Sequence, residues 1–191
     1  MADKNNILFI NACVRTGSRT NRLARRIMDS IGGTIMEVRP AEVVKPITTE
    51  EFLRLRDEAS MKMDFSSNVF APALAFAEAD EIVVAAPYWD MSFPAILKAY
   101  FEQINVIGVT FKYSDKGIPI GLCRAKRLTY VTTAGGPIFS DEYGFGYVKA
   151  LAQGFYGIKE VCLVKAEDLD VIDADVEGIL EKAFSEWKNR Q

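Results

Sequence analysis

The chain has 191 residues, enough for one domain with a sizeable core and short for two. Its net charge of -3 and pI of about 5.2 argue against a general nucleic-acid-binding protein, which usually carries a basic face. It contains no histidine, which excludes His-ligated zinc, Ser-His and Cys-His catalysis and imidazole proton shuttles. An enzyme without histidine can still work if a cofactor carries the difficult chemistry.

Cysteine usage and hydropathy indicate the compartment. Cys13, Cys123 and Cys162 are scattered and form no Cys-x-x-Cys pair, as is typical of free thiols in a reducing compartment. The sequence shows neither a signal peptide nor a run of about 18 apolar residues. We therefore expect a cytoplasmic protein that binds no nucleic acid, no membrane and no metal.

The first half of the chain alternates apolar runs with helical periodicity. Residues 7–10 form a continuous apolar run, typical of a strand buried on both faces. Apolar residues at helical spacing then predict a helix over 22–31, ended by two glycines. The next expected elements are a strand at 34–38, a connector between Pro40 and Pro46, a helix from a Thr48-x-x-Glu51 capping box to about Met63, a helix from Ser67 to about Ala79, and a strand at 81–86.

The second half continues the alternation and adds a hairpin. Pro94 fits the first turn of a helix that runs to about Asn105. An Asp-Lys-Gly turn at 115–117 separates two short strands and predicts a hairpin. The remaining expected elements are the hairpin strands at 110–113 and 118–121, a strand at 128–132, a helix from about 146 to 155, a strand at 161–164 and a helix at 174–188.

Five apolar strands alternating with helices predict one α/β domain over residues 1–191. The expected architecture is an open five-stranded parallel sheet in the order 2-1-3-4-5, with helices on both faces. Such sheets bind ligands beyond the carboxyl ends of their strands, where the strand order reverses. The loops after the first, third and fourth strands would therefore converge.

The loop after the first strand has the composition of an anion site. Arg15, Ser18, Arg19 and Thr20 surround Gly17 just before a helix, whose free amides and dipole favour an anion. No Gly-Lys-Ser/Thr and no Gly-x-Gly-x-x-Gly motif is present, which favours a monophosphate over a nucleoside triphosphate. The alternative is a simple N-cap at Ser18 or Thr20 beside two solvated arginines.

The other two loops offer aromatic surface and backbone amides. The loop after the third strand contains Pro87, Tyr88, Trp89, Asp90 and Met91. It would stack on a flat ligand, or else close the end of the sheet by local packing. The loop after the fourth strand contains Thr133, Ala134, Gly135 and Gly136. Its amides would stabilise negative charge on a ring edge, or else form an ordinary turn. Together the three loops could hold the phosphate, ring face and ring edge of a flavin.

At these residues the sequence resembles the flavodoxin-like NAD(P)H-dependent oxidoreductases, which include the FMN-dependent NADH azoreductases and the NAD(P)H quinone reductases. The resemblance covers roughly residues 7–166 and is carried by Ser18-x-Thr20-Asn21, Pro87 to Ser92, Gly108-x-Thr110-Phe111-x-Tyr113 and Thr133-Ala134-Gly135-Gly136. It implies a flavodoxin-like fold, bound FMN, NADH or NADPH as electron donor and usually a homodimer.

The resemblance also implies roles for these segments. Ser18, Arg19 and Thr20 match the FMN phosphate loop, 87–91 the loop along the isoalloxazine ring, and 133–136 the loop at its pyrimidine edge. Phe111 matches an aromatic residue of the substrate pocket that often lies across the dimer interface, and Tyr113 is expected beside it. The alternative for both residues is an ordinary buried hairpin. Azoreductases commonly have Asn at the position of Asp90 and Arg at that of Ala134. We therefore expect a lower flavin potential here, since a carboxylate disfavours the anionic reduced ring.

The expected function is that of an FMN-dependent NAD(P)H oxidoreductase. It would transfer two electrons by ping-pong hydride transfer to a small quinone-like or azo acceptor, with the flavin and no side chain as the catalytic group. The alternative is a flavodoxin-like electron carrier without a substrate of its own. The extended second crossover, the hairpin and Phe111 favour the enzyme, because they suggest an enclosed pocket.

Overall fold

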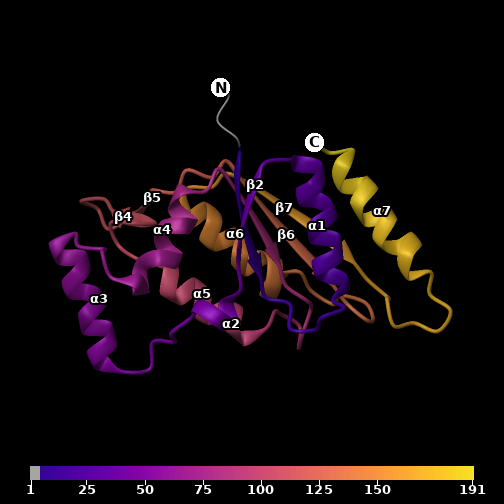
Figure 1. Ribbon diagram of the computed structural model, residues 1–191, viewed down its shortest axis with the longest axis horizontal. Helices are drawn as coiled ribbons and strands as arrows, with labels where there is room; N and C mark the ends of the chain where they lie inside the picture. The colour runs from indigo at the N-terminus through magenta and orange to yellow at the C-terminus, as the bar shows by residue number, and fades with distance from the viewer. Residues whose placement is uncertain (1–4) are drawn as a thin grey trace.

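A computed structural model describes residues 5–191 as a five-stranded parallel sheet between two layers of helices (Figure 1). The strands of this sheet are β1 (Asn6–Asn11), β2 (Thr34–Val38), β3 (Glu81–Ala85), β6 (Arg127–Thr133) and β7 (Glu160–Ala166). The helices are α1 (Arg19–Ile31), α2 (Pro40–Val43), α3 (Glu50–Lys62), α4 (Ala71–Glu78), α5 (Ala95–Ile104), α6 (Tyr147–Leu151) and α7 (Val176–Lys188). The expected hairpin is present as β4 (Phe111–Tyr113) and β5 (Pro119–Gly121), which pair antiparallel.

The strand order of the sheet is β2-β1-β3-β6-β7, and every neighbouring pair is parallel. In chain numbering this is 2-1-3-6-7, whereas the expected order 2-1-3-4-5 numbered only the five strands of the sheet. The difference arises because β4 and β5 intervene in the sequence but pair only with each other in a separate sheet. The order reverses between β1 and β3, so the loops after these two strands diverge to opposite faces and open a crevice.

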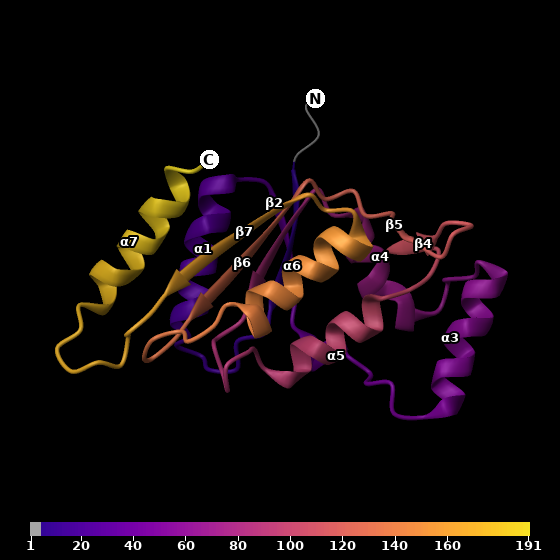
Figure 2. The same cartoon turned by 180° about the vertical axis from the view of Figure 1, so that it is seen from behind.

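The sheet is covered on both faces, as the continuous apolar run in β1 predicts. Ile7 and Phe9 pack under α1 and α7, whereas Leu8 and Ile10 face the layer that contains α4, α5 and α6 (Figures 1 and 2). Successive side chains of a strand point to opposite faces, so four consecutive buried residues require a core on each side. Trp187 of α7 is 2% exposed and belongs to the core on the α1 side.

Several element ends differ from the sequence expectations. Thr49, not Thr48, caps α3, and its hydroxyl accepts a hydrogen bond from the amide of Phe52 at 3.2 Å. Ser67 precedes a 3₁₀ turn (Asn68–Phe70) without a side-chain capping bond, and Pro94 lies at the N-cap of α5. The helix expected at 146–155 begins earlier, because π-helical segments at Glu142–Gly146 and Ala152–Tyr156 extend α6 at both ends.

The hairpin lies at the amino end of the sheet. Helix α5 carries the chain away from the carboxyl edge, and the segment after β5 runs past the start of β3, where the amide of Lys126 donates to the carbonyl of Asp80 at 3.2 Å. Figures 1 and 2 both show β4 and β5 near the amino ends of the central strands. The hairpin and the three loops that follow β1, β3 and β6 are therefore at opposite ends of the sheet.

Candidate functional site

The loops after β1, β3 and β6 enclose a cavity of about 280 Å³ at the carboxyl edge of the sheet. The lining residues are Val14, Arg15, Gly17, Ser18, Arg19, Thr20, Pro87, Tyr88, Trp89, Thr133, Ala134, Gly135 and Asp170. The three loops thus meet as the strand order requires. Of the residues expected to bind a flavin, Asp90, Met91 and Gly136 lie in these loops but outside the lining of the cavity.

Direct hydrogen bonds join the three loops. The hydroxyls of Thr20 and Thr133 lie 2.7 Å apart in a buried contact between the start of α1 and the end of β6. The amide of Tyr88 donates to the carbonyl of Thr133 at 3.0 Å, which ties the aromatic loop to the same point. Thr20 is 1% exposed, so its hydroxyl supports the floor of the cavity from beneath.

The start of α1 presents unpaired amides to the cavity. Ser18 is the N-cap, and its hydroxyl accepts from the amide of Asn21 at 3.3 Å. Within residues 5–191, the amides of Gly17, Arg19 and Thr20 donate to no acceptor. A methyl group placed on Gly17 would meet nothing within 4 Å, so the space beside Gly17 is open. The N-cap alternative is correct for Ser18, and the same turn leaves three free amides of the kind that bind anions at helix N-termini.

The two arginines of this loop differ in their surroundings. Arg19 donates from Nη1 to the carbonyl of Leu169 at 2.9 Å and from Nη2 to Asp170 Oδ1 at 2.7 Å. Arg15 lines the cavity and forms no ion pair with any residue of the described part of the chain. The other arginines of α1 pair with Glu177, Glu37 and Glu181, as expected for a solvated helix face.

The aromatic loop contains a tight turn with an unusual backbone. The amide of Ser92 donates to the carbonyl of Trp89 at 2.8 Å, and the amide of Trp89 returns a bond to Ser92 at 3.1 Å. The two residues between them, Asp90 and Met91, have φ angles of 48° and 66°, which non-glycine residues rarely adopt. The turn holds Trp89 at the cavity with 40% of its surface exposed, so a flat aromatic face remains accessible.

The loop after β6 is held by a segment that sequence reasoning missed. The amides of Asp170, Leu169 and Asp168 donate to the carbonyls of Gly135, Ala134 and Gly136 at 2.8, 3.2 and 3.2 Å, respectively. The amides of Gly135 and Gly136 donate to no acceptor within residues 5–191, as expected for groups available to a ligand.

Asp170 lines the cavity and was not among the expected site residues. The position of Asp170 in the sequence could have indicated its role. It follows β7, another strand whose carboxyl end lies at this edge of the sheet. A rule that includes every strand end, and not only the loops rich in glycine or aromatic residues, would have found it.

The residues expected in the substrate pocket do not reach this cavity from the same chain. Phe111 is 5% exposed and packs edge-to-face on Phe155, with ring centroids 5.1 Å apart. The buried-hairpin alternative therefore describes Phe111 as it lies in this chain. Tyr113 is 50% exposed at the surface of the hairpin. Both residues are at the amino end of the sheet, away from the cavity.

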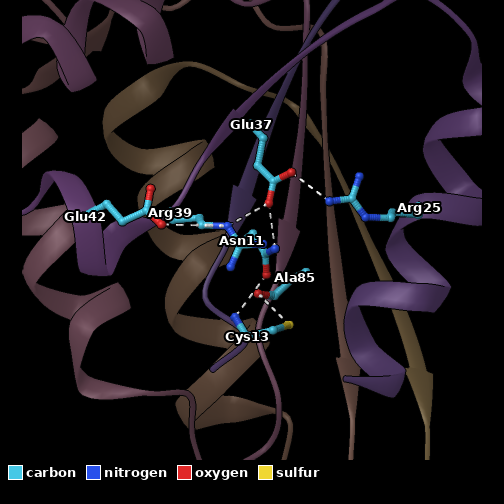
Figure 3. Close-up of polar contacts among 7 residues, drawn as sticks. All are labelled: Asn11, Cys13, Arg25, Glu37, Arg39, Glu42 and Ala85. Carbon is cyan, nitrogen blue, oxygen red and sulfur yellow. Dashed lines mark hydrogen bonds and ion pairs between the residues drawn. The ribbon is translucent and has the colours of Figure 1, made fainter. Parts of the chain in front are cut away.

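A polar network supports the beginning of the loop after β1 (Figure 3). The Asn11 side chain accepts from the amide of Cys13 at 3.1 Å and donates to Glu37 Oε1 at 2.8 Å. Arg25 donates to Glu37 Oε2 at 2.7 Å, and Arg39 lies 3.2 Å from Oε1. Burial raises the pKa of Glu37, but the Asn11 and Arg25 donors and the arginine charges outweigh it and leave the pKa below its usual value.

Cys13 is packed beneath this loop and is 8% exposed. Burial raises the pKa of its thiol, although a hydrogen bond with Ser18 and the charge of Arg39 oppose the effect. A buried thiol with a raised pKa is a poor nucleophile. The structure thus supports a space-filling role for Cys13.

The comparisons with known proteins agree with this geometry. The sequence profile of the family described as Flavodoxin-like fold matches residues 5–190. FMN-dependent NADH:quinone oxidoreductase 2 of Clostridium acetobutylicum is 43% identical over 128 residues, which are 64% of this chain and 63% of that protein, or less than two thirds of its length. FMN-dependent NADH:quinone oxidoreductase of Clostridium beijerinckii is 39% identical over 145 residues, 72% of each chain.

Solved structures share the whole fold. The azoreductase from Bacillus anthracis str. Sterne superposes with a TM-score of 0.80 at 23% identity, covering 97% of this chain and 98% of that one. At this identity the likeness establishes the fold alone.

No helix within residues 5–191 is long and apolar enough to cross a membrane.

Proposed function

This chain belongs to the flavodoxin-like fold family, and from that premise we propose that it is an FMN-dependent NADH oxidoreductase. The named relatives that carry this proposal are FMN-dependent NADH:quinone oxidoreductases. The observation that carries it in the structure is the anion cradle at α1, with its free amides and Arg15, set in one cavity with the exposed face of Trp89. This pairing suits a flat ring linked to a phosphate.

The donor set of the cavity fits FMN. The amides of Gly17, Arg19 and Thr20 would bind the phosphate, helped by the α1 dipole. Trp89 offers ring-stacking surface, and the free amides of Gly135 and Gly136 suit acceptor atoms on a ring edge. When bound, FMN supplies the two-electron hydride chemistry, and the protein binds and orients it. Asp90 and Met91 would act through the shape of the turn that presents Trp89.

The names of the relatives support NADH as the donor and a flat quinone as the acceptor, and a flat azo compound has a similar shape. Trp89 would cover one face of the flavin, which leaves the other face for the donor and the acceptor. One face used in turn by donor and acceptor gives ping-pong kinetics, with parallel double-reciprocal lines. Intersecting lines would contradict this order. An electron carrier without a substrate of its own would not oxidise NADH directly.

The decisive experiment is an anaerobic visible spectrum of the protein reconstituted with FMN, before and after addition of NADH or NADPH. Bound flavin that NADH bleaches promptly supports the proposal, and the two donors are compared in the same cell. Protein that binds no FMN would refute it. Bound flavin that neither donor bleaches would favour the electron carrier.

A matched pair of variants tests the ring site. Trp89→Ala should weaken FMN binding by about tenfold, since stacking of a planar base on an aromatic side chain contributes roughly 1–3 kcal/mol. Phe139→Ala is the control, because Phe139 is 80% exposed and lies outside the cavity lining. Equal losses in the two variants would contradict a stacking role for Trp89.

We also propose a homodimer in the cytoplasm. The hairpin region exposes several apolar side chains, Ile107, Tyr113, Ile118, Ile120 and Leu122. Contiguous exposed apolar surface marks interaction sites, and a partner that covers it could bring Tyr113 to the other cavity. The cysteines Cys13, Cys123 and Cys162 are free thiols, in keeping with a reducing compartment. Sedimentation of the wild type and of Ile118→Asp tests the dimer, and a monomeric wild type would contradict it.

A further inference from the structure

Arg19 bridges two loops of the cavity rim instead of facing an anion. It sits at the first position of α1, yet its guanidinium donates to the Leu169 carbonyl at 2.9 Å and to Asp170 Oδ1 at 2.7 Å. The Arg19 side chain is 35% exposed and that of Asp170 66% exposed. Two donors of one planar guanidinium thus hold two neighbouring acceptors on the segment after β7, a geometry that a lysine does not reproduce.

The segment that Arg19 holds is the one that fixes the Gly135 loop. Asp170 donates its amide to the Gly135 carbonyl at 2.8 Å, and Leu169 donates to Ala134 at 3.2 Å. The Asp170 carboxylate also lies directly over Gly135, where a methyl group would be 2.2 Å from Oδ2. The carbonyl of Gly135 is thus held by Asp170, and Asp170 is held by Arg19. These two contacts fix the direction of the free Gly135 amide.

The same contact changes the charge available to an anion. The Asp170 carboxylate neutralises Arg19 at 2.7 Å, and its negative charge lies within the cavity lining. Arg15, by contrast, has no ion pair within residues 5–191. An anion that enters the cradle therefore meets one guanidinium already paired and another whose full charge is free.

We propose that Arg19 and Asp170 are positioning residues, a latch that joins the start of α1 to the loop at Gly135, and that Arg15 is the guanidinium that meets the phosphate. The assignment of Arg15 rests on the proposed function, because the phosphate is that of the flavin. The latch itself is a property of the protein without ligand, so the two parts are tested by different measurements.

The latch is tested by amide hydrogen exchange on the flavin-free protein. Arg19→Gln and Asp170→Asn should each accelerate exchange at the amides of Leu169 and Asp170 by about fivefold to tenfold. The double variant should exchange no faster than Arg19→Gln alone, because Arg19→Gln already removes both contacts of the guanidinium. Arg22→Gln is the control, since Arg22 lies on the same helix as Arg19, pairs with Glu177 of α7 at 2.7 Å and does not line the cavity. Unchanged exchange, additive effects, or an equal effect in the control would overturn the latch.

The charge assignment is tested by comparing FMN with riboflavin, which lacks the phosphate. The ratio of their affinities should fall about tenfold in Arg15→Gln and change less than about twofold in Arg19→Gln. A fall in Arg19→Gln as large as that in Arg15→Gln would overturn the assignment. If the wild type binds neither flavin, the proposed function fails and the assignment of Arg15 fails with it, whereas the exchange data still decide the latch.

Discussion

The buried contact between Thr20 and Thr133 predicts a specific pattern of stabilities. Their hydroxyls lie 2.7 Å apart, and the two residues are 1% and 8% exposed. Replacing Thr20 by Val keeps the shape of the side chain but leaves the Thr133 hydroxyl buried without this partner. The variant should lose about 1–3 kcal/mol of unfolding free energy, the usual penalty for an unsatisfied buried polar group.

The double variant distinguishes this contact from simple packing. Thr133→Val should cost a similar amount, but Thr20→Val/Thr133→Val should cost about as much as one change alone, since no orphan hydroxyl remains. Urea denaturation of the flavin-free wild type, the two single variants and the double variant gives the four unfolding free energies of a double-mutant cycle. Additive losses would refute the contact as the link between the loops.

Thr129 provides a matched control on the same strand. It is 0% exposed, and its hydroxyl has no hydrogen-bond partner within residues 5–191. Thr129→Val should therefore be neutral or stabilising, because it removes a buried polar group that already lacks a bond. A loss equal to that of Thr20→Val would mean that the measurement reports a general cost of replacing threonine.

Three further predictions concern the hairpin, the polar network and the flavin potential. A methyl group on Gly121 would lie 2.2 Å from backbone atoms of the segment after α6, so Gly121→Ala should lower the free energy of unfolding in urea by about 2–3 kcal/mol. Gly154 has open space around it, so Gly154→Ala should raise the free energy of unfolding by about 0.5–1 kcal/mol. Equal effects of the two would contradict the close approach of the hairpin. The pKa of Glu37 is lowered in the folded protein, so the wild type should be more stable than Glu37→Gln by at most about 1 kcal/mol near neutral pH, and the difference should vanish as the pH falls below the usual pKa towards the lowered one. A difference that grows in acid would contradict this sign. Asp90→Asn should raise the flavin potential in a potentiometric titration, because it removes a negative charge next to Trp89, which lines the cavity, and an unchanged potential would contradict an effect of this carboxylate on the ring.

The sequence predicted the layers and the edge at which the site lies, because both depend on local pattern. Four consecutive apolar residues, 7–10, can be buried only if both faces of the sheet are covered, and the structure buries them so. Loops after parallel strands meet at the carboxyl edge, and the turns at Ser18, Trp89 and Gly135 do line one cavity there. These conclusions need only the strand period and the direction of the chain.

The element ends were less accurately predicted, since several neighbouring residues could serve equally well. Thr48 and Thr49 are both good N-caps, and only the packing of the chain decides that Thr49 caps α3. The π-helical segments around α6 have no local sequence signature comparable to a cap or a turn. The strand numbering likewise depends on where the hairpin pairs, which is a tertiary property.

What the sequence by itself determined is therefore the composition of the loops: arginines and hydroxyls before a helix, an aromatic turn and a glycine loop at one edge of a parallel sheet. Only the tertiary structure decided which of these groups are free. Arg15 and Arg19 are the same residue type four positions apart, yet Arg19 is paired with Asp170, more than a hundred residues away in the sequence. It also buried Phe111 against Phe155 of the segment after α6, away from the cavity. Such pairings depend on distances between segments that the fold alone brings together, and no local pattern of residues records them.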